Sequence, residues 1–137
     1  MITINPRALA ELIGTHATVE LIDVRPRNAF EREHIRGARS IPLSDLHAAR
    51  IVQDRGSRNP RPLFLVCNGR LRASLAAGML REAGCLEPVV MEGGMESWRV
   101  LGLPTLQPYG RVRAWLHRVA AALHPDARLV RPQTASA

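Results

Sequence analysis

The chain has 137 residues, 46% of them apolar, and a formal charge of +7, with 19 arginines and no lysine. This length fits one domain with a short appendage, and this apolar fraction excludes a wholly disordered chain. No apolar run approaches the roughly 20 residues of a membrane span, and the N-terminus lacks the basic and apolar blocks of a secretory signal. We therefore expect a cytoplasmic protein without an integral membrane span.

Apolar runs, helical stripes and turn formers predict short strands that alternate with helices. In chain order, the predicted elements are a strand at 2–4, a helix at 6–14, a strand at 20–24, a helix at 28–33, a strand at 38–41, a helix at 44–51, a strand at 63–67, a helix at 73–83, a strand at 88–91 and a helix at 95–101. The polar, turn-rich segment 54–62 predicts a surface loop.

The alternation of strands and helices predicts an α/β fold over residues 1–106. We expect a mainly parallel central sheet with helices on both faces. Two strands, 20–24 and 63–67, are near-continuous apolar runs, which is typical of strands buried in such a sheet. In open parallel sheets, the functional site lies beyond the carboxyl ends of the strands.

Residues 107–137 are predicted to form a C-terminal amphipathic helix, at 109–123, and a flexible tail. An apolar stripe runs along this helix, formed by Val112, Trp115, Leu116, Val119 and Leu123. The stripe fits packing on its own domain, pairing with a second copy as a homodimer, or attachment to a membrane surface. The first two are favoured because the stripe is short.

The positive charge of the chain suggests anionic partners. Nucleic-acid binding favours a basic stripe interleaved with aromatic residues. Here the arginines are scattered, and only two Phe, two Trp and one Tyr are present. We therefore expect small anions rather than nucleic acid.

Cys67 is the strongest candidate for chemistry. It ends a predicted buried strand, and a predicted helix begins a few residues later. The free amides and the dipole of that helix favour negative charge, and Arg70 and Arg72 add positive charge. Gly69 allows successive amides to turn inward as an anion nest. These features favour a thiolate nucleophile over a small core residue.

The second cysteine, Cys85, is interpreted as structural, because it lies in an apolar stretch that enters a strand. A reducing compartment disfavours a disulfide between the two cysteines.

Other polar and aromatic residues are weaker candidates. Asp23 and Arg25 lie at a strand end, where they either support the site or form a structural ion pair, and the ion pair is favoured. Ser74 either caps the helix or lines the pocket. His34 is interpreted as a hydrogen-bonded scaffold residue, and Trp98 as a core aromatic residue.

Four short blocks of sequence occur in a fixed order over about residues 1–106. They are Leu21-Ile22-Asp23-Val24-Arg25, Phe30…His34-Ile35…Gly37-Ala38…Ile41-Pro42, Val66-Cys67…Arg72…Ala76-Ala77 and Gly93-Gly94…Trp98…Gly102-Leu103-Pro104. Together these blocks resemble the rhodanese (sulfurtransferase) homology domain. Each block is short, but four in the right order are specific.

The resemblance implies a persulfide shuttle on Cys67. The thiolate would take the outer sulfur of thiosulfate or a similar small anionic donor and pass it to cyanide, a small thiol or a protein thiol. The resemblance also implies that the backbone amides and arginines of the loop bind the donor and the persulfide. The binding residues are Asn68, Gly69, Arg70, Leu71 and Arg72. It implies no metal and no organic cofactor.

Loop length carries a further implication of the resemblance. Sulfur-transferring members of the family have a loop of six residues, counted from the cysteine to the arginine. The loop of related phosphatases and arsenate reductases has seven residues. Cys67 to Arg72 spans six residues, so sulfur transfer is preferred to phosphatase or arsenate reductase chemistry. A sulfur relay that serves a protein partner, with little turnover of small molecules, stays an alternative to an enzyme of the thiosulfate sulfurtransferase type.

One loop position departs from the family pattern. Arg70 stands where a glycine is common, and the glycine of this loop is Gly69, one position earlier. An arginine would be strained there if the position needs a positive φ. Alternatively, Arg70 adds an anion clamp.

Overall fold

A computed structural model describes residues 1–15, 18–56 and 59–107 of the chain. Met1–Leu106 form one compact unit. The helix predicted at 109–123 and the tail that follows it lie outside the described residues. Within the described ranges, no helix is both long and apolar enough to cross a membrane.

A five-stranded sheet forms the centre of the fold, and all of its strand pairs are parallel. In chain order the strands are β1 (Ile2–Ile4), β2 (Glu20–Asp23), β3 (Arg39–Ser40), β4 (Leu63–Val66) and β5 (Pro88–Met91). The helices are α1 (Pro6–Gly14), α2 (Arg27–Arg32), the 3-10 turn η1 (Leu43–Asp45), α3 (Ala48–Arg55), α4 (Leu71–Glu82) and α5 (Gly94–Val100). The strands lie side by side in the order β1-β5-β4-β2-β3. These elements confirm the predicted α/β class with a parallel sheet.

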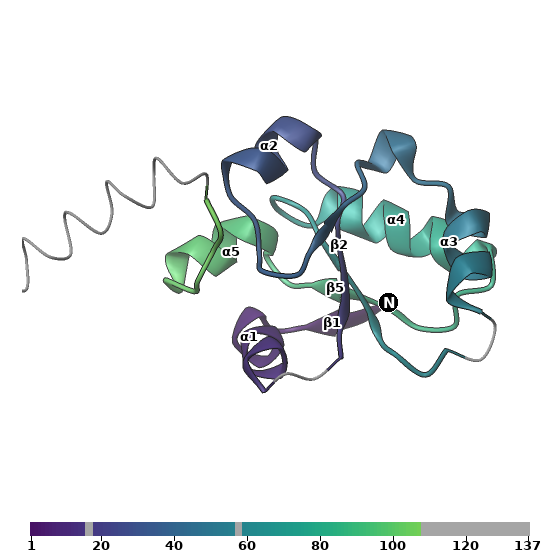
Figure 1. The fold of residues 1–137 in the computed structure, drawn as a ribbon, viewed down its shortest axis with the longest axis horizontal. Helices are drawn as coiled ribbons and strands as arrows, with labels where there is room; N and C mark the ends of the chain where they lie inside the picture. Colours follow the sequence, from purple (N-terminus) through teal and green to yellow (C-terminus); the bar gives the residue numbers. More distant parts are fainter. Residues whose placement is uncertain (16–17, 57–58, 108–137) are drawn as a thin grey trace, which may run out of the picture. The chain divides into compact units, whose positions relative to one another are not determined.

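The central strand β4 shows how the sheet is covered on both faces. Leu63 and Leu65 pack into the apolar cluster on the side of α3 and α4. Phe64 and Val66 pack into the cluster on the side of α1 and α5. Figure 1 shows the same division, with these two pairs of helices on opposite sides of the sheet. Because both faces are covered, the strand is apolar at every position, as the sequence predicted.

The segment after β3 differs from the prediction of one helix at 44–51. The chain forms η1, and α3 begins only at Ala48. Between them, Leu46 has an extended backbone and is 5% exposed. Its burial in the core interrupts the helix, and local sequence does not reveal this tertiary contact.

A buried ion pair closes the end of β2. Asp23 and Arg25 are 0% and 2% exposed, and Arg25 Nη2 lies 2.7 Å from Asp23 Oδ2. Arg25 Nε donates to the same carboxylate at 3.0 Å, and Nη2 also donates to the carbonyl oxygen of Glu33 at 2.7 Å. The pair therefore ties the end of β2 to the end of α2, in agreement with the structural interpretation of these two residues.

We expect Arg25→Met to lower the free energy of unfolding by about 3–5 kcal/mol, because it leaves the Asp23 carboxylate buried without a charged partner. Arg39→Met is the matched control. Arg39 is 61% exposed and pairs with Glu20 at 3.4 Å, so its loss should cost less than about 1 kcal/mol. Urea unfolding measures both variants, and equal losses would contradict the role assigned to the buried pair.

Candidate active site

Cys67 directly follows β4, at the edge of the sheet where the parallel strands end. The residue is 2% exposed and packs with Ala73 of α4, in the cluster on the side of α3 and α4. The cysteine predicted as the nucleophile thus lies at the carboxyl edge, where α/β sheets carry their functional sites.

The carbonyl groups that follow β4 are held by α5. The N–H of Met95 donates to the carbonyl oxygen of Cys67 at 2.8 Å, and the N–H of Glu96 donates to that of Asn68 at 3.0 Å. The described peptide bonds are all trans, so the N–H groups of Asn68 and Gly69 point away from α5. Since α5 covers the opposite face of the sheet, these amides turn toward the side on which Cys67 packs.

Gly94 allows α5 to approach the loop this closely. A Cβ atom at this position would overlap the carbonyl oxygens of Cys67, Asn68 and Gly69. Gly94 also has a left-handed φ of +56°, which disfavours any residue with a side chain. Both the space and the backbone conformation therefore require glycine.

The backbone at two loop positions bears on the alternatives left open for Arg70 and on the role expected for Gly69. Arg70 precedes the first turn of α4 with φ −132° and ψ −33°, so the arginine is not in the left-handed region and carries no strain of that kind. Gly69 is also outside the left-handed region, and a Cβ there would meet no atom within 4 Å. The loop therefore does not use the conformational freedom of Gly69.

The N-terminus of α4 supplies further amides beside Cys67. The helix begins at Leu71, two residues earlier than predicted, so Leu71 and Arg72 lie in its first turn. In the described part of the chain no side chain caps these amides, and Ser74 donates its hydroxyl to the carbonyl oxygen of Arg70 at 3.0 Å. Ser74 thus contacts the loop backbone instead of capping the helix. Free amides at a helix N-terminus favour an anion.

The guanidinium groups of Arg70 and Arg72 are exposed. Within the described ranges neither makes a hydrogen bond or an ion pair, so both can contact an anion from solvent.

The side chain of Asn68 is directed at α5. Its Nδ2 donates to Glu96 Oε1 at 2.7 Å, and Arg99 Nη1 donates to its Oδ1 at 3.2 Å. Arg99 also contacts the Glu33 carboxylate. Asn68 was predicted to bind the donor. Its backbone amide can do so, whereas its side chain fastens the loop.

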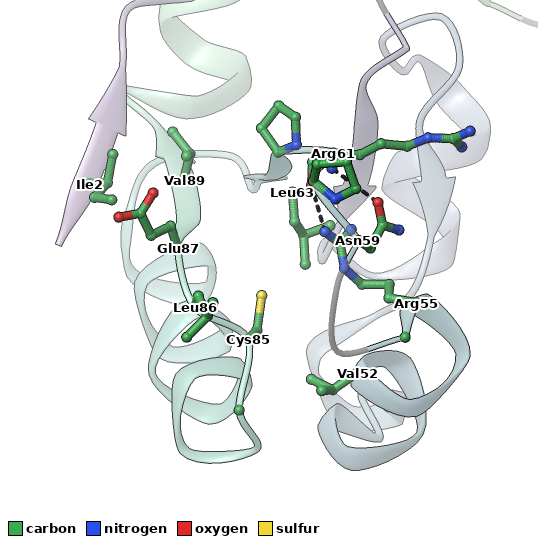
Figure 2. A pocket seen from close by; sticks show the side chains of 14 residues that line it. Ile2, Val52, Arg55, Asn59, Arg61, Leu63, Cys85, Leu86, Glu87 and Val89 are labelled. Carbon is green, nitrogen blue, oxygen red and sulfur yellow. Dashed lines mark hydrogen bonds between the residues drawn. The ribbon is translucent and has the colours of Figure 1, made fainter.

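The second cysteine lies at the other end of the sheet. Cys85 lines a cavity of about 520 Å³ near the amino ends of β4 and β5. Figure 2 shows it across this cavity from Arg55, Asn59 and Arg61. Arg55 Nη2 donates to the carbonyl oxygen of Arg61 at 2.6 Å, and the N–H of Arg61 donates to Asn59 Oδ1 at 3.0 Å. Two hydrogen bonds thus join residues of that wall, and Cys85 is not part of the Cys67 site.

His34 and Trp98 have the structural surroundings that the sequence predicted. His34 Nδ1 lies 2.9 Å from the carbonyl oxygen of Phe30, and the two rings stack with centroids 3.9 Å apart. Trp98 is 1% exposed, and its Nε1–H donates to the carbonyl oxygen of Pro104 at 3.1 Å.

Comparison with known proteins identifies the family. A sequence model of the rhodanese-like domain matches residues 5–100. The chain belongs to the rhodanese-like domain family. It is 42% identical over 88 residues to the uncharacterized protein YqhL of Bacillus subtilis, covering 64% of this chain and 67% of YqhL. It is 30% identical over 111 residues to the probable adenylyltransferase/sulfurtransferase MoeZ of Mycobacterium tuberculosis, covering 78% of this chain and 27% of MoeZ.

Other relatives support the same assignment. The uncharacterized protein slr1261 of Synechocystis is 36% identical over 106 residues, which cover 77% of this chain and 56% of slr1261. The chain therefore spans 27–67% of the length of these three relatives. The crystal structure of the Alr3790 protein from Anabaena superposes with a TM-score of 0.68 at 25% identity, covering 81% of this chain and 98% of that one.

Three residues that shape this rhodanese-like site were not predicted for it: Gly94, Glu96 and Arg99. Gly94 was noticed only as part of the fourth sequence block. Glu96 and Arg99 lie 28 and 31 positions from Asn68, so no local pattern connects them to the loop. Only the parallel alignment of β4 and β5 brings α5 to Cys67.

We expect Gly94→Ala to lower the free energy of unfolding by more than about 2 kcal/mol and to slow alkylation of Cys67 by iodoacetamide, because the new methyl group displaces the loop carbonyls. Gly69→Ala is the matched control within the loop, and it should cost less than about 1 kcal/mol. Urea unfolding and alkylation rates test both. A tolerated Gly94→Ala would show that α5 does not determine the loop geometry.

Proposed function

We propose that this rhodanese-like domain is a sulfurtransferase that carries a sulfane sulfur as a persulfide on Cys67, with thiosulfate or a similar anion as donor. The single observation that supports this most is the arrangement of backbone amides. Carbonyl contacts with α5 leave the N–H groups of Asn68 and Gly69 pointing away from α5, and the uncapped first turn of α4 begins beside them.

In the first step, the Cys67 thiolate attacks the outer sulfur of thiosulfate. A new S–S bond forms on Cys67, the S–S bond of thiosulfate breaks, and its electron pair leaves with sulfite. In the second step, an acceptor such as cyanide attacks the terminal persulfide sulfur, forming thiocyanate and restoring the Cys67 thiolate. The two steps balance without an external oxidant or reductant.

The chain supplies charge stabilisation for both steps. Preorganised amides favour the thiolate, the departing sulfite and the persulfide anion, because they need little reorientation as negative charge moves. The exposed side chains of Arg70 and Arg72 draw the anionic donor toward the loop. The six-residue span from Cys67 to Arg72 agrees with a sulfur-transferring loop rather than the longer loop of phosphatases and arsenate reductases.

A second candidate is a persulfide carrier that serves a protein thiol. The observation in its favour is an apolar stripe on α4, where Leu71, Leu75 and Met79 are 73%, 53% and 40% exposed. The stripe starts in the first turn of α4, directly behind the Cys67 loop, and exposed apolar patches of this kind mark interaction sites. In this case the persulfide would form but turn over poorly with small acceptors.

We expect incubation with thiosulfate to add about 32 Da, one sulfur atom, to the intact protein. The adduct should be absent from Cys67→Ser and present in the matched control Cys85→Ser, as measured by mass spectrometry. Addition of cyanide should then yield many equivalents of thiocyanate per protein. Thiocyanate that stops near one equivalent favours the carrier, and an adduct that persists in Cys67→Ser contradicts both candidates.

We expect Arg70→Ala to raise KM for thiosulfate by roughly threefold to tenfold with little change in kcat, because an exposed charge contributes about 1 kcal/mol to anion binding. Arg81→Ala is the control, since Arg81 is also exposed and lies in the last turn of α4, away from the loop. Steady-state thiocyanate production measures both. An equal rise of KM in the two variants would show that Arg70 acts only through the net charge of the protein.

A further inference from the structure

A network of side chains joins three loops at the carboxyl edge of the sheet. Glu33 directly follows α2, the helix after β2, whereas Asn68 follows β4. Glu96 and Arg99 belong to α5, which follows β5. Arg99 contacts both Glu33 and Asn68, so one guanidinium connects all three loops.

The Asn68 amide satisfies its partners in one orientation only. Its Nδ2 donates to the Glu96 carboxylate, and its Oδ1 accepts from the Arg99 guanidinium. If the amide turned over, its oxygen would face a carboxylate and its NH2 group would face a guanidinium. Neither arrangement can form a hydrogen bond, because a carboxylate only accepts and a guanidinium only donates. The two partners therefore favour this orientation of the Asn68 side chain.

The backbone of the same residue is held by the same helix. The carbonyl oxygen of Asn68 accepts from the N–H of Glu96 at 3.0 Å, which adds a third contact between Asn68 and α5. This contact fixes the peptide plane whose other end is the N–H of Gly69. Small displacements of such a donor matter, since misplacement by about 1 Å can lower a rate by two orders of magnitude.

We propose that Asn68 is a positioning residue for Cys67. Its side chain, gripped by Glu96 and Arg99, holds the first amides of the loop toward the sulfur and does not itself contact the substrate. For its effect on sulfur transfer this inference rests on the proposed function. For its effect on the reactivity of the Cys67 thiol it stands separately.

A polarity swap tests the network. Asn68→Asp sets two carboxylates against each other, whereas Asn68→Asp combined with Glu96→Gln restores the contact between positions 68 and 96 with donor and acceptor exchanged. In both variants Arg99 can still donate to the side chain at position 68. The double variant also keeps the net charge of the wild type. Asn68→Leu removes both contacts without adding charge. All variants are made in a Cys85→Ser background so that only Cys67 reacts.

Two rates are measured at one pH: alkylation of Cys67 by iodoacetamide, and persulfide formation at varied thiosulfate. We expect Asn68→Asp and Asn68→Leu each to slow alkylation and to lower the maximal rate of persulfide formation by roughly tenfold, with KM within about twofold of the wild type. The double variant should return both rates to within about twofold of the wild type.

Two controls separate positioning from charge and from stability. Asn28→Asp adds the same charge at an exposed asparagine outside the network, and it should leave both rates unchanged. Urea midpoints identify any variant that is slow because it is unfolded. If Asn68→Asp unfolds, Arg99→Ala is measured in its place, and Arg81→Ala serves as the control. We then expect slower alkylation of Cys67 in Arg99→Ala and an unchanged rate in Arg81→Ala.

The outcomes are distinct. Folded Asn68→Leu and Asn68→Asp variants that alkylate at the wild-type rate would overturn the positioning role, as would a double variant as slow as Asn68→Asp. A wild type that alkylates readily but forms no persulfide would contradict the proposed function, and the alkylation series would still decide the role of Asn68.

Discussion

The site depends on one backbone contact, in which the N-terminus of α5 lies against the carbonyl oxygens that follow Cys67. Two N–H groups of α5 bond to these oxygens, and Gly94 supplies the space. Each peptide plane has two ends, so fixing the carbonyls on one side aims the amides to the other. The backbone of the loop that follows Cys67 is thereby held by a glycine in another loop, and the parallel register of β4 and β5 keeps the two loops adjacent.

Four arginines in the described part of the chain differ in whether other side chains hold them. Arg25 is buried against Asp23, and Arg99 contacts the Glu33 carboxylate. Because Arg25 also donates to the carbonyl oxygen of Glu33, the buried pair and the exposed network meet at one residue. Arg70 and Arg72 make no such contacts in the described ranges. Arg25 and Arg99 therefore have structural roles, whereas Arg70 and Arg72 are available to attract anions.

Much of the fold could be predicted because local pattern and tertiary position agree. The apolar run of β4 and the glycines around α5 carried enough information for the sheet, the helices and the place of Cys67. Leu46 shows the limit, since its burial interrupts a helix that local sequence favours. Asn68 shows a second limit. Its place in the loop predicted anion binding, and only the position of α5 reveals the partners of its side chain. At Arg70 the family pattern left open a strained, left-handed backbone, and the backbone there is not left-handed.

The two cysteines of the chain can be compared by the backbone elements that surround each thiol. Both are free, and both pack with the apolar cluster on the side of α3 and α4. Cys67 follows the end of β4, and the N-terminus of α4 begins four residues later, at Leu71. Cys85 leaves the end of a helix and enters a strand, and its own N–H bonds back to the carbonyl oxygen of Leu80 at 2.8 Å. A helix C-terminus presents carbonyl groups rather than amides. The order of strand and helix around each cysteine therefore distinguishes the proposed nucleophile from a core residue, and this order can be read from the sequence before any side-chain contact is known.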